Sequence, residues 1–214
     1  RGSDFHSPDE SRIDLGTLPS LPAAYLRRGV ERSTLGQARQ LRTPRFVKPV
    51  DDKLFPARVY ATGCQVEPTL ELGGETPVLV SEVVTWGIEV RAFVLDRRIL
   101  ALSAYLRDGH LAQTDDGEWP LGEDEQAGAE RFLGELLADP AVQLPPAVVV
   151  DAGLIPGRGW AVVEANACWA AGLCGCDPRA VLPVVQRACV ASAAPRPGDP
   201  PWYRSRHRAA LGAP

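Results

Sequence analysis

Two short apolar runs in the sequence each end in side chains that carry hard oxygen atoms. Residues 161–163 lead into Glu164 and Asn166, and residues 148–150 lead into Asp151. Because side chains alternate between the two faces of a strand, Glu164 and Asn166 are expected to point the same way. Asp151 closes a neighbouring run and is expected to meet them. Two carboxylates and an amide oxygen suit a magnesium ion, which normally shares its oxygen ligands with substrate phosphates.

These three residues therefore predict an enzyme that uses a nucleotide. The alternative is that they only cap strand ends through hydrogen bonds. Against it, three oxygen donors beside very apolar runs are costly to bury without a cation.

The order of the expected strands and helices around these residues predicts an α+β fold, with antiparallel strands and segregated helices. The clearest helix covers residues 123–138, with an apolar face and an acidic first turn. Asp177-Pro178 is expected to cap a last helix running to about Ala194. Residues 21–40 are expected to form a short helical or looped segment. The expected strands are 46–49, 58–61, 78–84, 88–95, 99–105, 147–151 and 160–164.

Composition narrows the class of protein. Hydrophobic residues make up 45% and charged residues 23%, as in ordinary globular proteins. The net charge of −4 argues against a nucleic-acid partner, and no apolar run is long enough to predict a membrane span. The N-terminus has no apolar core, so no signal peptide is expected. The absence of Met, with heavy use of Ala, Arg, Gly and Pro, is typical of a GC-rich bacterial genome.

The five cysteines are an odd number, which together with the lack of a secretion signal predicts reduced thiols in a cytoplasm. Cys168, Cys174 and Cys176 cluster, so a zinc site is conceivable. However, no His lies near them and they form no CxxC pair, which favours small buried residues in a packed turn.

No motif for a covalent nucleophile or a known metal helix occurs. The chain has no Gly-rich phosphate loop, no GxSxG and no HExxH. Trp86, Trp160 and Trp169 flank the motifs described above and are candidates to line a cleft, although large aromatic residues are more often part of a core.

Several of these residues, in this order, resemble the ATP-grasp superfamily. Phe46-Val47-Lys48-Pro49 is similar to its strand with an ATP-contacting lysine, and Val80-Ser81-Glu82-Val83-Val84 to its adenine hinge. Glu89 has the position of its ribose-binding acid. Asp151 and the pair Glu164 and Asn166 resemble its magnesium ligands. The resemblance implies two small lobes that clasp ATP and Mg2+ between them.

The segment from Lys48 to Arg58 resembles one bacterial branch of the superfamily, named for an arginine and two lysines. The similarity covers most of residues 18–190. It implies a lead-in at 1–20, a smaller lobe at 21–85, a larger lobe at 86–194 and a Pro/Arg-rich tail at 195–214.

The resemblance also implies roles for four cations, each with a simpler alternative. Lys48 is expected on the ATP phosphates, with a surface lysine as the alternative, and Lys53 is either a phosphate-covering loop residue or an ordinary surface lysine. Arg58 is expected to hold phosphate or a carboxylate, or else to be a charge at a sheet edge. Arg91 is expected to neutralise an acyl phosphate or a carboxylate, or else to pair with Glu89.

Glu82, Val83 and Val84 are expected to bind adenine mainly through backbone groups, and Glu89 to bind the ribose. The alternative for both glutamates is a solvent-facing position on an amphipathic strand. Two features depart from the superfamily. The loop after the lysine strand contains no Gly, which shifts the expected phosphate contacts towards Lys53 and Arg58, and the N-terminal lobe that often helps to bind substrate is missing or vestigial.

Three hypotheses follow for function. The first is a carboxylate–amine ligase that forms an amide through an acyl phosphate and acts on small-molecule or peptide substrates. The second is a kinase-like phosphotransferase on the same scaffold, and the third a non-catalytic nucleotide-binding module. A homodimer or a partner protein is a candidate source of the missing lobe.

Overall fold

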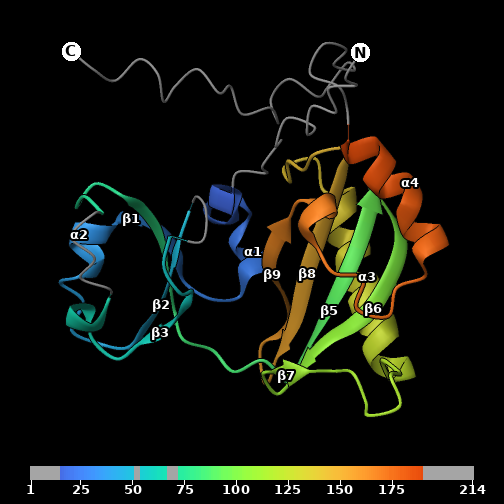
Figure 1. Ribbon diagram of the computed structural model, residues 1–214, viewed down its shortest axis with the longest axis horizontal. Helices are drawn as coiled ribbons and strands as arrows, with labels where there is room; N and C mark the ends of the chain where they lie inside the picture. Colours follow the sequence, from blue (N-terminus) through green and yellow to red (C-terminus); the bar gives the residue numbers. More distant parts are fainter. Residues whose placement is uncertain (1–14, 51–53, 67–71, 190–214) are drawn as a thin grey trace, which may run out of the picture.

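A computed structural model describes residues 15–50, 54–66 and 72–189. It contains two antiparallel sheets that lie side by side, with helices packed around them (Figure 1). This arrangement confirms the predicted α+β class. Most of the expected lead-in and all of the expected tail lie outside the described residues. No helix in the described ranges is long and apolar enough to cross a membrane.

The smaller sheet has four strands in the order β1-β4-β2-β3. One face packs in a separate core with helix α2 (Leu35–Ala38), whose Thr34 forms a capping box with Gln37. The opposite face, which carries Lys48 and Leu79, is turned towards the larger sheet. The strands are β1 (Val30–Thr34), β2 (Arg45–Pro49), β3 (Arg58–Tyr60) and β4 (Pro77–Ser81).

The larger sheet has five strands in the order β7-β6-β5-β8-β9. Its strands are β5 (Ile88–Leu95), β6 (Arg98–Arg107), β7 (His110–Leu111), β8 (Ala147–Ile155) and β9 (Gly159–Asn166).

Two helices cover opposite faces of this sheet. Ala92 and Val150 pack in the cluster that contains helix α3 (Glu123–Ala138). Phe93 and Val149, which point the other way, pack in the cluster that contains helix α4 (Pro178–Ala188). Arg91 and Asp151 lie two residues from Phe93 and Val149, so their side chains are on the same face of the sheet as α4. Both help to form the candidate site described below.

The segment before β1 packs on the larger sheet, although it leads into the smaller one. It contains the 3-10 helix η1 (Leu15–Ser20) and helix α1 (Ala23–Leu26), and Leu18 and Leu26 are buried in the core of β5, β8 and α3. Tyr25 Oη donates to Asp139 Oδ2 at 3.0 Å, beyond the end of α3. The chain therefore crosses from the larger lobe to the smaller lobe near Gly29.

The structure differs from the expected elements at several places. Residues 30–34 form an edge strand, not a helix or loop, because their mostly polar sequence gives no apolar alternation to detect. The strand expected over 78–84 ends at Ser81, where its last pairing occurs, and the following residues join the two sheets. β8 and β9 are longer than expected, and α4 ends at Ala188, short of Ala194.

Candidate functional site

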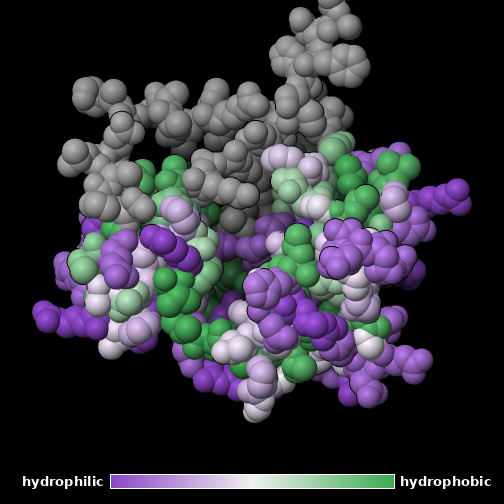
Figure 2. Space-filling model, turned by 60° about the horizontal axis from the view of Figure 1, so that its bottom comes forward, coloured by the Kyte–Doolittle hydropathy of each residue, from purple (hydrophilic) through white to green (hydrophobic). Residues whose placement is uncertain are grey.

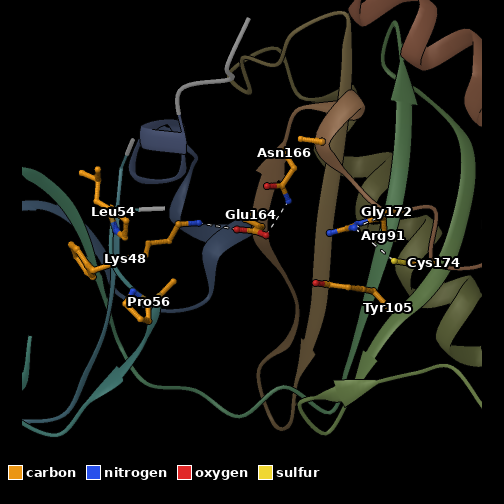
Figure 3. A pocket seen from close by; sticks show the side chains of 13 residues that line it. Lys48, Leu54, Pro56, Arg91, Tyr105, Glu164, Asn166, Gly172 and Cys174 are labelled. Carbon is orange, nitrogen blue, oxygen red and sulfur yellow. Dashed lines mark hydrogen bonds and ion pairs between the residues drawn. The ribbon is translucent and has the colours of Figure 1, made fainter. Parts of the chain in front are cut away.

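A row of charged side chains crosses the larger sheet where it faces the smaller one. Arg91 on β5 lies opposite Asp151 on β8, and Asp151 lies opposite Glu164 on β9. Cross-strand neighbours on one face lie close enough for direct contact. Lys48 on β2 extends the row from the smaller sheet by reaching Glu164. The row therefore has two neighbouring carboxylates between two cations and spans both sheets. Figure 3 shows its members Lys48, Glu164 and Arg91.

Arg91 and Asp151 form a buried bidentate pair. Arg91 Nε and Nη2 donate to the two carboxylate oxygens at 2.9 and 2.7 Å, and Asp151 has no exposed surface. A third nitrogen of Arg91 donates to the carbonyl of Gly172 at 3.2 Å. The guanidinium also lies 4.2 Å from the ring centroid of Tyr105. Arg91 thus ties the segment around Gly172 to the sheet.

Glu164 and Asn166 lie between this pair and Lys48. Lys48 Nζ is 2.8 Å from Glu164 Oε2, and the amide nitrogen of Asn166 donates to Glu164 at 2.9 Å and to Asp151 at 3.0 Å. Burial raises the pKa of Glu164, but Lys48 and Asn166 outweigh it and hold the pKa below its usual value. The carboxylate is therefore ionised at neutral pH.

The donor set at this point fits a hard divalent cation. One carboxylate oxygen each of Asp151 and Glu164 lies within hydrogen-bond distance of the same amide group of Asn166. Rotating that amide by half a turn brings its oxygen to the same point, and the choice between the two orientations depends on the surrounding network. Glu164 and Asn166 line the neighbouring cavity, whereas Asp151 lies behind them. Within the described ranges, no three His, Cys, Asp or Glu residues gather as a metal site.

A smaller cavity of about 390 Å3 lies between the sheets on one side of Lys48. Its walls are mostly apolar, and its rim includes Val83 and Val84 from the segment that joins the sheets. Such a slot with exposed backbone groups at its edge suits a flat base. Other lining residues are Leu18, Phe46, Val59, Leu79, Trp86 and Leu106.

Glu89 is the main buried acid in the wall of this cavity. It is 7% exposed, and burial, followed by the charges of Asp151 and Glu164, raises its pKa to about 7. Its carboxyl group lines the cavity, and the ribose-binding role expected for it stays a prediction. It shares its face of β5 with Arg91, but the structure pairs Arg91 with Asp151.

Arg28 is a lining residue of the smaller cavity that the sequence did not reveal. It donates to the carbonyls of Val162 and Val163 at 2.6 and 3.2 Å, where a bulge in β9 frees Val163 from the ladder. Its guanidinium lies 4.9 Å from the ring centroid of Trp86. Burial lowers the pKa of Arg28 to about 10, although nearby Glu89 and Glu82 raise it.

A larger cavity of about 940 Å3 begins where the smaller one ends. The two share Lys48, Ala57, Tyr105 and Glu164. Figure 2 shows the hollow between the two lobes, with apolar side chains around its opening. Tyr105, also missed from the sequence, reaches both cavities because a bulge in β6 leaves it unpaired with β5.

Three other residues were expected at the site: Lys53, Arg58 and Glu82. Lys53 lies outside the described residues. Arg58 lines neither cavity, and its guanidinium lies 4.8 Å from the ring centroid of Tyr60. The Glu82 side chain forms an exposed ion pair with Arg158 at 2.7 Å, so that backbone atoms near Glu82 remain to meet a base.

The clustered cysteines have structural surroundings. All five cysteines are free thiols, and Cys168 and Cys176 are buried in the core under α4. Cys174 lines the larger cavity, with its Sγ 3.7 Å from Arg91 Nη1. Burial raises the pKa of Cys176 to about 12.

Comparisons with known proteins address the family and the fold. A profile of an ATP-grasp domain family, the second family of the clade named for one arginine and two lysines, matches residues 25–184. No curated protein matches the chain. The RimK domain protein ATP-grasp from Sphaerobacter thermophilus DSM 20745 matches at 18% identity and a TM-score of 0.54, over 83% of this chain and 66% of that one.

D-alanine–D-alanine ligase from Bacillus anthracis, solved in complex with ATP, matches at 16% identity and a TM-score of 0.45. This match covers 72% of the chain and 53% of the ligase. The chain therefore spans less than two thirds of the length of either solved structure. At these identities the comparison concerns the fold alone.

Proposed function

The chain belongs to the second family of the arginine-and-two-lysines clade of ATP-grasp domains, and from this membership we propose that it is an ATP- and magnesium-dependent carboxylate–amine ligase. One observation carries the proposal. A slot suited to a base and a larger cavity meet at Lys48 and Glu164, beside the side-chain amide of Asn166. A nucleotide and a second substrate thus have separate spaces that join at one reactive point.

The nucleotide is proposed to occupy the smaller cavity with its phosphates directed towards Lys48. The base lies between apolar walls, with its edge at the backbone of Val83 and Val84, and the ribose hydroxyls meet Glu89. The phosphates then arrive at the junction of the two cavities. Arg28 keeps the wall formed by β9 in place through the carbonyls that it binds.

Magnesium is proposed to be held by Glu164 and Asn166, with Asp151 directly behind them. Bound there, the ion would neutralise charge on the phosphates. Lys48 would add a positive charge from the smaller lobe. The negative charge that develops on the transferred phosphoryl group would then be stabilised by groups that are already in position. Arg91 is too fully engaged with Asp151 and Gly172 to serve as a mobile cation, and it positions Asp151 and the cavity wall.

The proposed reaction has two steps. A substrate carboxylate oxygen attacks the terminal phosphorus of ATP, and the bond to the bridging oxygen breaks to give an acyl phosphate and ADP. An amine then attacks the acyl carbon, phosphate leaves, and the nitrogen loses a proton to give an amide. The residues at the junction contribute positioning and charge neutralisation, so no covalent enzyme nucleophile is needed.

The acid and the amine are proposed to be small molecules or peptides. We also propose that a second copy or a partner protein contributes to the substrate site. The odd number of cysteines favours a reducing compartment, and we propose a bacterial cytoplasm.

A trapping assay tests the activity without knowledge of the natural amine. The protein is incubated with Mg–ATP, a panel of carboxylic acids and hydroxylamine, which converts an acyl phosphate to a hydroxamate. The proposal predicts hydroxamate, ADP and phosphate in equal amounts, and their loss in Glu164→Gln. A stable phosphorylated acid or alcohol, with no hydroxamate for any acid, would instead indicate a phosphotransferase.

A further inference from the structure

The larger cavity has its charged side chains already paired. Of its described lining residues, Lys48 and Glu164 bond to each other, and Arg91 is held by Asp151 directly behind the wall. Lys48 and Glu164 are also the groups that the proposed function assigns to the phosphates and magnesium. These paired residues leave no charge to attract a charged substrate side chain.

Arg91 is further restrained by groups other than Asp151. One of its terminal nitrogens donates to the Gly172 carbonyl, and the same nitrogen lies 3.7 Å from Cys174 Sγ. Its planar group lies against the Tyr105 ring. Rotating Arg91 towards a substrate would leave buried Asp151 without its cation, which is strongly unfavourable.

Both sides of the larger cavity include apolar residues. On the smaller lobe, Leu54 and Pro56 lie in the loop after β2, and Gly172 lies across the cavity on the larger lobe (Figure 3). Ala170, which also lines the cavity, follows β9. Leu54 is 44% exposed although it lies at this cavity. Covering this exposed apolar surface with an apolar group of a ligand removes it from water, which favours binding.

We propose that the larger cavity binds the acid substrate through an apolar side chain of about the size of Leu or Phe. This inference rests on the proposed ligase function, which puts a carboxylate at the Lys48–Glu164 junction. The carboxylate then lies beside Asn166, and the side chain extends between Leu54 and Ala170. The volume of about 940 Å3 leaves room for such a side chain beyond the nucleotide phosphates.

Leu54 and Leu182 provide a matched test of the apolar wall. Both are exposed leucines, at 44% and 55%, but Leu182 lies on α4 and lines neither cavity. Leu54→Lys puts a cation into the wall, whereas Leu182→Lys adds the same charge elsewhere. Both substitutions are at exposed positions and are expected to preserve the fold.

Binding is measured by calorimetry with Mg2+ and a non-hydrolysable ATP analogue present. The ligands are N-acetylated leucine, phenylalanine, glutamate and lysine, which differ only in the side chain. We expect the leucine and phenylalanine compounds to bind about tenfold or more tighter than the charged ones. Leu54→Lys should remove at least most of this preference and favour the glutamate compound, while Leu182→Lys should not change it.

Equal or tighter binding of the charged compounds to the wild type, or binding of none of the four, would overturn the inference. An unchanged preference in Leu54→Lys would also overturn it. Because this readout needs no turnover, it is separate from the hydroxamate assay. If the apolar compounds bind more tightly but no hydroxamate forms, the ligase proposal is rejected and the apolar binding site is kept. If hydroxamate forms only from charged acids, the ligase proposal is kept and the apolar binding site is rejected.

Discussion

Lys48 and Glu164 form an ion pair across the cleft, with Nζ and Oε2 2.8 Å apart, and so connect the smaller sheet to the larger one. Lys48 is 9% exposed, and the Glu164 carboxylate also meets Asn166. In the proposed function Lys48 meets the ATP phosphates and Glu164 holds magnesium. Binding Mg–ATP must therefore replace this pair, with the metal on Glu164 and the phosphates on Lys48.

This exchange predicts opposite effects of Lys48→Met on the metal and on ATP. Without the lysine, Glu164 and Asn166 have no competing cation, so Mn2+ used as a probe for magnesium should bind several-fold tighter in the absence of nucleotide. ATP with magnesium should bind about tenfold or more weakly, because a charge on its phosphates is lost. Electron paramagnetic resonance of free Mn2+ and calorimetry of ATP measure the two quantities. Weaker Mn2+ binding would show that Lys48 does not compete for Glu164.

Arg91→Met is predicted to destabilise the protein by about 3–5 kcal/mol, since it leaves the Asp151 charge buried and unpaired. Urea unfolding measures the loss. The control is Arg158→Met, which breaks the exposed pair with Glu82 and should lower stability far less. In Arg91→Met/Asp151→Leu both charges are gone, so much of the stability should return. Equal losses for Arg91→Met and Arg158→Met would contradict a structural role for the buried pair.

Glu89 is predicted to make stability depend on pH. Its pKa is raised from 4.5 to about 7 in the folded protein, chiefly by burial. The folded state therefore holds this proton more tightly, and the free energy of unfolding falls as pH rises from about 4.5 to about 7. The full effect above pH 7 is on the order of 3 kcal/mol.

Glu89→Gln removes this ionisation. Without nucleotide or magnesium, its melting temperature relative to wild type should increase from pH 4.5 to pH 8. Glu118→Gln, the same change at an exposed position, is the control. A difference between Glu89→Gln and wild type that stays constant over this range would refute the assignment.

Gly153→Ala is predicted to disturb the smaller cavity. A Cβ atom at Gly153 would lie 2.5 Å from Trp86 Cε3 and 3.2 Å from Glu89 Cγ, so the Trp86 ring must move. We expect weaker ATP binding and a changed tryptophan emission spectrum. Gly134→Ala is the matched control, because its Cβ would meet no atom within 4 Å and the site is in α3. That variant should keep ATP affinity and gain about 0.5–1 kcal/mol of stability.

The sequence predicted the fold class and the family resemblance, and both are confirmed. The candidate ligands Asp151, Glu164 and Asn166 were readable because they follow strongly apolar runs, although β8 continues past Asp151 to Ile155. Helix α3 was predicted at its observed bounds because its apolar periodicity is clear. These patterns involve residues that are close in the sequence, so they can be read without knowing how the elements are arranged in space.

Long-range pairings were not readable in this way. The partner of Arg91 depends on the order β5-β8-β9 and its register, which puts Asp151 directly opposite. Arg28 reaches the smaller cavity because residues before β1 pack on the larger sheet, far along the chain from β9. Glu82 was expected at the hinge, but its ion pair with Arg158 could not be predicted. The pair forms because the turn between β8 and β9 lies beside Glu82, which the sequence does not reveal.

The central claim is that magnesium and ATP bind together at the junction of the two cavities. Isothermal titration of ATP with and without magnesium, on wild type and on Glu164→Gln/Asn166→Ala, tests it most directly, with Glu118→Gln as the control. The account predicts magnesium-dependent binding that the double variant weakens at least tenfold and that the control retains. Equal ATP affinity in wild type and the double variant, or no binding to the folded wild type with magnesium present, would contradict it.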